Sequence, residues 1–210
     1  MMPRQPSAKS ISLIERFEIG DPDDYVSHPV WPGGASGLTV GIGYDLGYSS
    51  PAQIGQDWSI LPAQTIARLQ FCAGKAGSNA QQLVSRVADI NVPFDAARSV
   101  FEARDIPRTC MLTEGAFLNT DKISADSFGA LVSLIFNRGA GMTDTTPGDR
   151  LEMRQIRDAM QSGDFAQVPG FIRAMKRLWV GRGLDGLLAR RDAEADLFQA
   201  GLTSQLPGET

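Results

Sequence analysis

This chain of 210 residues has one histidine and two cysteines, and its net charge is negative. The single histidine, His28, argues against catalytic triads, which need a histidine base, and against zinc centres built on two or three histidines. Because His28 lies in a loop-like segment rich in proline and glycine, YVSHPVWPGG, we expect a surface residue there. A net charge of −4 argues against electrostatic binding to nucleic acid. Any chemistry should therefore rest on carboxylates.

The two cysteines, Cys72 and Cys110, are far apart and form no C-x-x-C motif, so we expect buried free thiols rather than a disulfide or a metal site. No apolar run approaches the roughly 18 residues that a membrane-spanning helix needs. No apolar stretch typical of a secretory signal follows the first residues, MMPRQPSAKS. We therefore expect a protein that is made in the cytoplasm without a signal peptide and does not insert into membranes.

Two regions of different texture follow one another along the chain. Residues 10–20, SISLIERFEIG, predict a short helix closed by its final glycine. Residues 25–48 are rich in glycine, proline and β-formers, which predicts strands or a hairpin with a long loop. From Pro51 on, helical periodicity prevails. The strongly apolar segment SADSFGALVSLIFNRGAG, which begins at Ser124, predicts a buried helix.

The expected fold class is α+β. Residues 11–200 should form one domain, with a small hairpin lobe at about 20–50 and a larger helical lobe at about 51–200. A flexible leader over 1–10 and a flexible tail over 201–210 should flank it. The first helix is too short to be stable alone, so we expect it to pack on the helical lobe.

Residues 36–50, SGLTVGIGYDLGYSS, have the alternation of a strand, which Gly41, Gly43 and Gly47 interrupt. Glycine weakens a strand unless something must come close to the backbone. A dinucleotide fingerprint is disfavoured because the third glycine comes one position late and the surroundings resemble an all-β region. We expect these glycines to let an extended polymer lie close to the backbone.

Two acids flank this stretch. Glu18 stands near the end of the first helix, after Phe17, and Asp45 ends the glycine-rich strand. Taken singly, they are most simply a solvated surface acid and a turn or cap residue. Together with Thr39, however, they are the groups that glycoside hydrolysis needs. One acid protonates the leaving oxygen, and one carboxylate, helped by a hydroxyl, activates water.

Four segments occur in this order along the chain: LIERFEIG at 13–20, GLTVGIGYDLG at 37–47, ALVSLIFNRG at 130–139 and LLARRDAEADLF at 187–198. Together they resemble the phage-type lysozymes, which have a helix ending F-E-G and a hairpin reading T-I-G-x-G. They are closest to the pesticin-like lysozyme domain, which carries T-x-G-x-G-Y-D-L-G. The resemblance covers roughly residues 11–200, although 51–125 matches only in texture.

The resemblance implies a lysozyme-like fold with a cleft between the two lobes. It also implies a muramidase that cleaves the β-1,4 bond between N-acetylmuramic acid and N-acetylglucosamine with inversion. It places the general acid on Glu18, the water-positioning threonine on Thr39 and the second carboxylate on Asp45. Many phage lysozymes instead carry the second acid earlier in the hairpin, where this chain has Ser27, and a histidine where it has Tyr44.

Substrate contacts are implied as well. An amide is expected to face the sugar at Asn137, for which a helix C-cap is the alternative. An arginine is expected near the catalytic acid at Arg190 or Arg191, for which a solvated charged face is the alternative. The expected substrate-binding residues are Tyr44, Gly41, Gly43, Asn137 and Arg190, and the rivals of Asp45 as second acid are Asp21, Asp23 and Asp24.

No cofactor and no metal is expected, and the expected partner is a peptidoglycan glycan strand. Many lysozymes are basic, whereas the pI here is near 5.0, so we expect a delivery apparatus to bring the enzyme to the wall. A phage endolysin and a secreted antibacterial effector with its own immunity protein are both compatible with this. The alternatives are a lytic transglycosylase, a chitinase-like enzyme and a non-catalytic wall-binding module.

Overall fold

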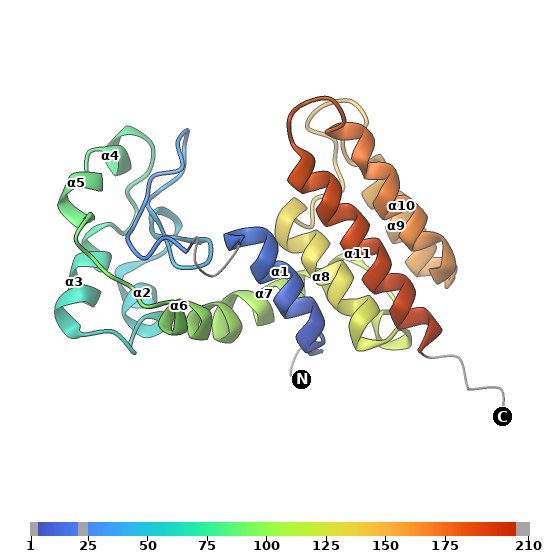
Figure 1. Ribbon diagram of the computed structural model, residues 1–210, viewed down its shortest axis with the longest axis horizontal. Helices are drawn as coiled ribbons and strands as arrows, with labels where there is room; N and C mark the ends of the chain where they lie inside the picture. Colours follow the sequence, from blue (N-terminus) through green and yellow to red (C-terminus); the bar gives the residue numbers. More distant parts are fainter. Residues whose placement is uncertain (1–3, 21–24, 205–210) are drawn as a thin grey trace. The chain divides into compact units, whose positions relative to one another are not determined.

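A computed structural model describes residues 4–20 and 25–204 of the chain, which divides into two units (Figure 1). The helical unit comprises residues up to Phe17 and from Ile106 onward, and the hairpin unit comprises Glu18–Asp105. The structure is mostly helical, 63%, with one small two-stranded antiparallel sheet, which is compatible with the expected α+β class.

Helix α8, Ala125–Arg138, forms the centre of the helical unit. Ser124 caps it, because its hydroxyl oxygen accepts a hydrogen bond from the backbone N–H of Ser127 at 3.0 Å. Every residue from Ser127 to Ile135 is buried, which confirms the predicted buried helix. Helix α11, Asp185–Thr203, packs along α8, and α10, Val168–Ala174, packs on α11 (Figure 1).

Small residues let two helices approach α8 closely. A Cβ added at Gly129 would stand 2.0 Å from the hydroxyl oxygen of Ser10 in α1, Ala8–Ile19. A Cβ added at Gly201 of α11 would stand 2.3 Å from the hydroxyl oxygen of Ser127. The part of α1 that belongs to the helical unit therefore packs on the helices of that unit.

The segment expected to be a flexible leader is largely structured. Helix α1 already begins at Ala8, and Arg4 donates hydrogen bonds to the carbonyl oxygens of Thr120 and Ile123. These bonds hold residues 4–10 against the helical unit. At the other end of the chain, α11 continues to Thr203, so it includes the first residues of the expected tail.

The remaining helices of this unit are short or of medium length. They are α7 Ile106–Ala116, η4 Thr120–Lys122, α9 Leu151–Ser162, η5 Phe165–Gln167 and η6 Met175–Leu178. Helix α10 contains Pro169 near its start. Proline is tolerated there because it stands in the first turn.

The hairpin unit has less regular structure than the sequence predicted. Its strands are only β1, Thr39–Val40, and β2, Tyr44–Asp45, which pair antiparallel with Thr39 opposite Asp45. An isolated bridge pairs Val30 with Thr39 on the other side. Most of residues 25–48 is therefore loop, held by a few backbone hydrogen bonds.

Short helices surround this hairpin within the same unit. They are η2 Leu46–Tyr48, α2 Pro51–Asp57, α3 Ala63–Phe71, α4 Ser78–Gln81, α5 Val84–Val87, α6 Phe94–Val100 and the π-helix η3 Phe101–Asp105. We had expected residues 51–105 in the helical lobe. They pack instead around the hairpin, where Trp58 meets the ring of Tyr44 with centroids 5.4 Å apart.

Both cysteines are buried free thiols, as predicted. Burial raises the pKa of Cys110 to about 12, which keeps this thiol protonated and unreactive at neutral pH. None of the helices in the described part of the chain is long and apolar enough to cross a membrane.

Candidate active site

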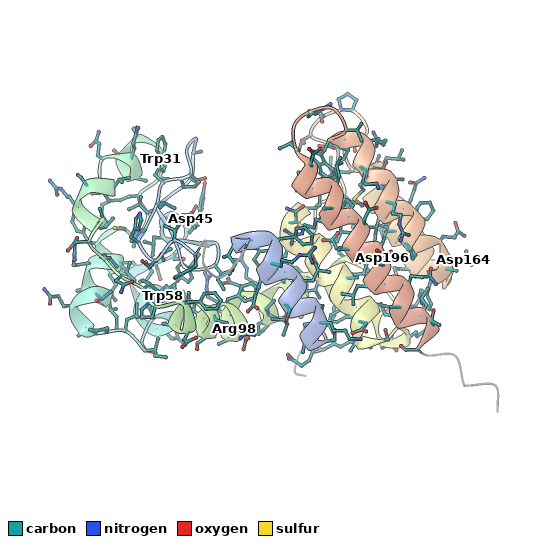
Figure 2. The ribbon with its side chains drawn as sticks, in the orientation of Figure 1. Trp31, Asp45, Trp58, Arg98, Asp164 and Asp196 are labelled. Carbon is teal, nitrogen blue, oxygen red and sulfur yellow. The ribbon has the colours of Figure 1, made fainter. Side chains whose placement is uncertain are left out.

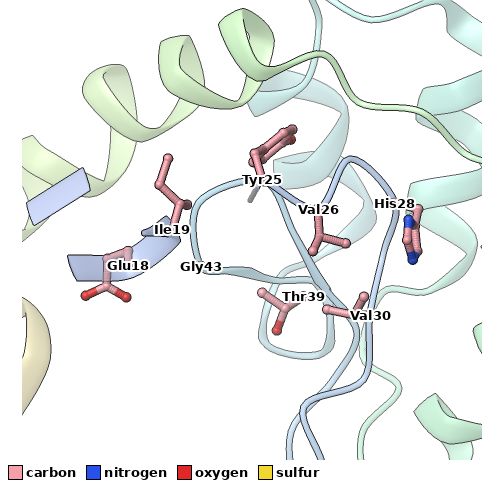
Figure 3. A pocket seen from close by; sticks show the side chains of 9 residues that line it. Glu18, Ile19, Tyr25, Val26, His28, Val30, Thr39 and Gly43 are labelled. Atoms are coloured by element: carbon pink, nitrogen blue, oxygen red, sulfur yellow. The ribbon is translucent and has the colours of Figure 1, made fainter. Parts of the chain in front are cut away.

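A pocket of about 320 Å³ lies within the hairpin unit (Figure 3). It is lined by Glu18, Ile19, Tyr25, Val26, His28, Val30, Thr39, Gly41 and Gly43. Four residues that the sequence singled out therefore meet in one place: Glu18, Thr39, Gly41 and Gly43. They come from three segments, namely the end of α1, the strand β1 and the turn after it.

Glu18 reaches the pocket because α1 ends just after it. Gly20 follows the helix with φ of +72°, a left-handed conformation that glycine adopts without strain. Phe17, the residue before Glu18, is held in place by two arginines. The guanidinium carbons of Arg16 and Arg190 lie 4.8 and 5.7 Å from the centre of its ring. The carboxyl of Glu18 itself is exposed at the rim.

Thr39 is fixed by backbone pairing on both sides. Its N–H donates to the carbonyl oxygen of Val30 at 2.7 Å, and its own carbonyl oxygen accepts from the Val30 N–H at 2.9 Å. On its other side it pairs with Asp45. The Thr39 hydroxyl makes no hydrogen bond to another described residue, so it is available to hold a water molecule or a sugar hydroxyl.

The glycines of this stretch serve different purposes. Gly43 has φ of +76° and open space where a side chain would stand, so its backbone faces the pocket bare. At Gly41 an added Cβ would stand 2.8 Å from the Trp58 ring. At Gly47 it would stand 2.7 Å from the Cα of Gly37. Internal packing therefore explains the requirement for glycine at Gly41 and Gly47, whereas Gly43 leaves its backbone open at the pocket.

Asp45 does not line the pocket. Its Oδ2 accepts a hydrogen bond from the N–H of Gly37 at 3.1 Å, and its Oδ1 accepts one from the N–H of Gly47 at 2.8 Å, which caps η2. Figure 2 shows Asp45 among the side chains of the hairpin unit. The structure thus brings Thr39 to the pocket with Glu18 but does not bring Asp45 there, and gives Asp45 the turn and cap role that was its simpler interpretation.

Tyr44 corrects a second expectation. Its side chain is only 1% exposed, so it cannot contact a substrate as the resemblance implied. The hydroxyl donates to Oδ2 of Asp57 at 2.8 Å, and the guanidinium of Arg104 lies 4.1 Å from the ring centre. Burial raises its pKa to about 12. Tyr44 is therefore a core residue of the hairpin unit.

Arg190 is also buried rather than available to substrate. It is 2% exposed in the helical unit, where its Nε donates to Oε1 of Glu194 at 3.2 Å. Arg191 donates to the same oxygen at 2.9 Å and to Oδ1 of Asn137 at 3.1 Å. The amide oxygen of Asn137, which was expected to face the sugar, thus accepts a hydrogen bond from the buried Arg191. Because both arginines are buried, they form neither the solvated charged face nor the substrate contact that was expected of them.

Two groups of residues remain. The rival acids Asp21, Asp23 and Asp24 lie outside the described residues. His28, which sequence reasoning set aside as a surface residue, is exposed but lines the pocket with Glu18 and Thr39. No periodicity signals this position, because it follows from the bridge between Val30 and Thr39 rather than from local pattern.

A second pocket in the hairpin unit, of about 330 Å³, has less to offer chemically. Its charged groups are Asp57 and Arg104, which form an ion pair at 2.9 Å. Asp57 also accepts hydrogen bonds from Tyr44 and Gln53. These charges are already balanced by each other, so the pocket around Glu18 is the candidate active site.

Within residues 4–20 and 25–204, no group of three or more histidine, cysteine, aspartate or glutamate side chains is arranged to hold a metal ion. No model of a known protein family matches the chain, and no curated protein matches it either.

Proposed function

We propose that this protein is a peptidoglycan hydrolase, a muramidase with a lysozyme-like fold that cleaves the β-1,4 bond between N-acetylmuramic acid and N-acetylglucosamine. The observation that carries the proposal is the convergence of Glu18, Thr39 and the bare backbone of Gly43 in one pocket. These are a carboxyl that can donate a proton, a hydroxyl that can hold water and a surface without side chains on which a sugar ring can lie.

In the proposed mechanism Glu18 protonates the glycosidic oxygen as its bond to the anomeric carbon breaks. The hydroxyl of Thr39 holds a water molecule, which attacks the anomeric carbon from the opposite face and inverts its configuration. The partner is a glycan strand of the cell wall, which the protein reaches by release or delivery, in agreement with its acidic pI.

A lytic transglycosylase is the second candidate, and the position of Asp45 favours it. Such an enzyme needs one acid and no partner that activates water. Among the described residues that line the pocket, Glu18 is the one carboxylate, while both oxygens of Asp45 accept backbone N–H groups elsewhere. The products separate the two reactions, since hydrolysis leaves a reducing sugar and transglycosylation leaves an anhydro sugar.

The test is digestion of purified peptidoglycan, followed by turbidity and by mass spectrometry of the products. We expect reducing ends from the wild type and a loss of about 10²- to 10⁴-fold in the rate of Glu18→Gln, the usual contribution of a general acid. Thermal unfolding should stay unchanged because Glu18 is exposed.

Glu15→Gln is the matched control, one helical turn earlier in α1, and it should cleave at close to the wild-type rate. Cleavage by Glu18→Gln at the wild-type rate would remove Glu18 from its role. Binding of the wild type to peptidoglycan without any cleavage would identify a wall-binding module instead.

A further inference from the structure

The pocket holds a second group that can accept a proton. We propose that His28 is the general base that removes a proton from the attacking water. This inference rests on the proposed function, because a base is needed only if water is the nucleophile. Its starting observation is that His28 lines the same pocket as Glu18 and Thr39 (Figure 3).

Other groups near the pocket are unsuited to this role. The described titratable residues that line it are Glu18, Tyr25 and His28. The Tyr25 hydroxyl donates to the carbonyl oxygen of Val92 at 3.0 Å, and burial raises its pKa to about 12. Asp45 lies outside the lining, with both carboxylate oxygens bound to backbone N–H groups. With Glu18 as the acid, His28 is the residue that can serve as the base among the described lining residues.

The backbone on either side of His28 is anchored. Before it, the carbonyl oxygen of Ser27 accepts a hydrogen bond from the N–H of Val92 at 2.7 Å. After it, Pro29 is buried and Val30 exchanges two backbone hydrogen bonds with Thr39. Thr39 would hold the water and His28 would deprotonate it. The backbone bridge between Val30 and Thr39 therefore fixes the chain next to His28 to the strand that carries Thr39.

The imidazole itself is free for chemistry. It is exposed, and it makes no hydrogen bond to another described residue. A neutral imidazole carries one nitrogen that accepts a proton, as a general base must. An inverting glycosidase needs a second functional group besides its acid, and His28 lines the pocket together with Glu18.

The step balances without any further reactant. The neutral imidazole of His28 takes one proton from water while the water oxygen bonds to the anomeric carbon. The bond from that carbon to the leaving oxygen breaks, and Glu18 delivers its proton to this oxygen. Glu18 ends as a carboxylate and His28 as an imidazolium. Both are restored when His28 releases one proton to solvent and Glu18 takes one up.

The test compares wild type, His28→Ala and His28→Asn on purified peptidoglycan. We expect kcat to fall by about 10²- to 10³-fold with little change in KM, because a base acts on the transition state rather than on binding. Val180→Ala is the matched control, since Val180 is exposed like His28 but does not line the pocket and cannot titrate. It should keep nearly full activity, and all variants should unfold at the wild-type temperature.

Two further readouts distinguish a base from a residue that only shapes the pocket. The pH profile of kcat/KM should show one ionisation in the wild type that is absent in His28→Asn. Azide, a nucleophile that needs no deprotonation, should restore turnover to His28→Ala and yield a glycosyl azide of inverted configuration. It should not restore Glu18→Gln, which lacks the acid.

The outcomes separate this inference from the proposed function. A wild type that does not cleave peptidoglycan, or a fully active Glu18→Gln, contradicts the proposed function. Cleavage that depends on Glu18 but persists in His28→Ala with an unchanged pH profile overturns the role of His28 alone. So does a larger loss in Asp23→Asn than in His28→Asn. A product with an anhydro end contradicts the proposed hydrolysis itself, and with it the role of His28, since no water is then activated.

Discussion

Each unit of this protein contains a carboxylate that is partly or fully buried, and the two carboxylates have different kinds of hydrogen-bond donor. In the helical unit, Glu194 is fully buried and meets charged side chains, the guanidinium groups of Arg190 and Arg191, together with the Ser133 hydroxyl at 2.6 Å. In the hairpin unit, Asp45 meets backbone N–H groups of Gly37 and Gly47 instead.

The difference follows from the regular structure available in each unit. Long helices already use their backbone N–H groups internally, so a buried carboxylate among them depends on side chains. Loops leave N–H groups unpaired, and an aspartate can organise them into a turn. Asp45 thereby shapes the segment that presents Thr39 and Gly43, while Glu18 and His28 stay exposed at the pocket.

The sharpest way to break this contrast is to remove the acid of the helical unit. Glu194→Ala leaves two buried guanidinium groups without their carboxylate, so we expect the free energy of unfolding to fall by about 3–5 kcal/mol. Burial already lowers the pKa of Arg191 to about 10 and leaves its Nε and Nη1 without partners among the described residues. Guanidinium chloride titration followed by circular dichroism measures the loss.

Asp192→Ala is the control for this variant. Asp192 stands on the same helix but is 44% exposed, and its ion pair with Lys176 at 2.7 Å is a surface pair. We expect it to change stability by less than about 1 kcal/mol. Equal losses in the two variants would show that burial of Glu194 does not matter to stability.

In the hairpin unit the corresponding change should cost less. Asp45→Asn keeps the shape but replaces a charged acceptor of two N–H groups by an amide with one acceptor oxygen, so we expect a loss of about 1–3 kcal/mol. Cleavage at temperatures well below unfolding should persist. A rate loss of several orders of magnitude at unchanged stability would instead return Asp45 to the catalytic role that the resemblance implies.

The smallest expected effect concerns alkaline pH. The pKa of Tyr44 is raised by burial from about 10 to about 12, so between these values the unfolded state loses its proton first and stability falls as pH rises. This contributes about 1.4 kcal/mol per pH unit at most. Tyr44→Phe should therefore show a shallower decline of unfolding free energy from pH 10 to 12.

Tyr48→Phe serves as the comparison because its ring is 74% exposed. We expect it to follow the wild-type decline over the same range. A wild-type slope in Tyr44→Phe would mean that the tyrosine is not buried as the structure places it.

Helices of the helical unit could be predicted because their signals are local. Ser124 stands before an apolar run, and Gly20 follows α1. Capping and 3.6-residue periodicity act within a few residues, so they survive in any context. The hairpin unit has fewer such local signals. Its two strands are only two residues long each, shorter than the sequence predicted.

The candidate site divides in the same way. Glu18, Thr39 and Gly43 were identified from their order along the chain, and the structure gathers them in the pocket. Tyr44 and Arg190 were predicted to contact substrate, but both are buried. The tyrosine packs on Trp58, and the arginine pairs with Glu194. A charged or aromatic residue looks alike in sequence whether its partner is water or another side chain.

The sequence by itself predicted the buried helix α8 and singled out Glu18, Thr39 and Gly43 as candidate site residues, which the structure places in one pocket. Only the tertiary structure decided that Asp45 holds a turn and that His28 reaches the pocket. The physical reason is range: helix signals and chemical identity are properties of neighbours in sequence. Burial and pairing, such as the bridge between Val30 and Thr39, depend on residues that meet only after folding.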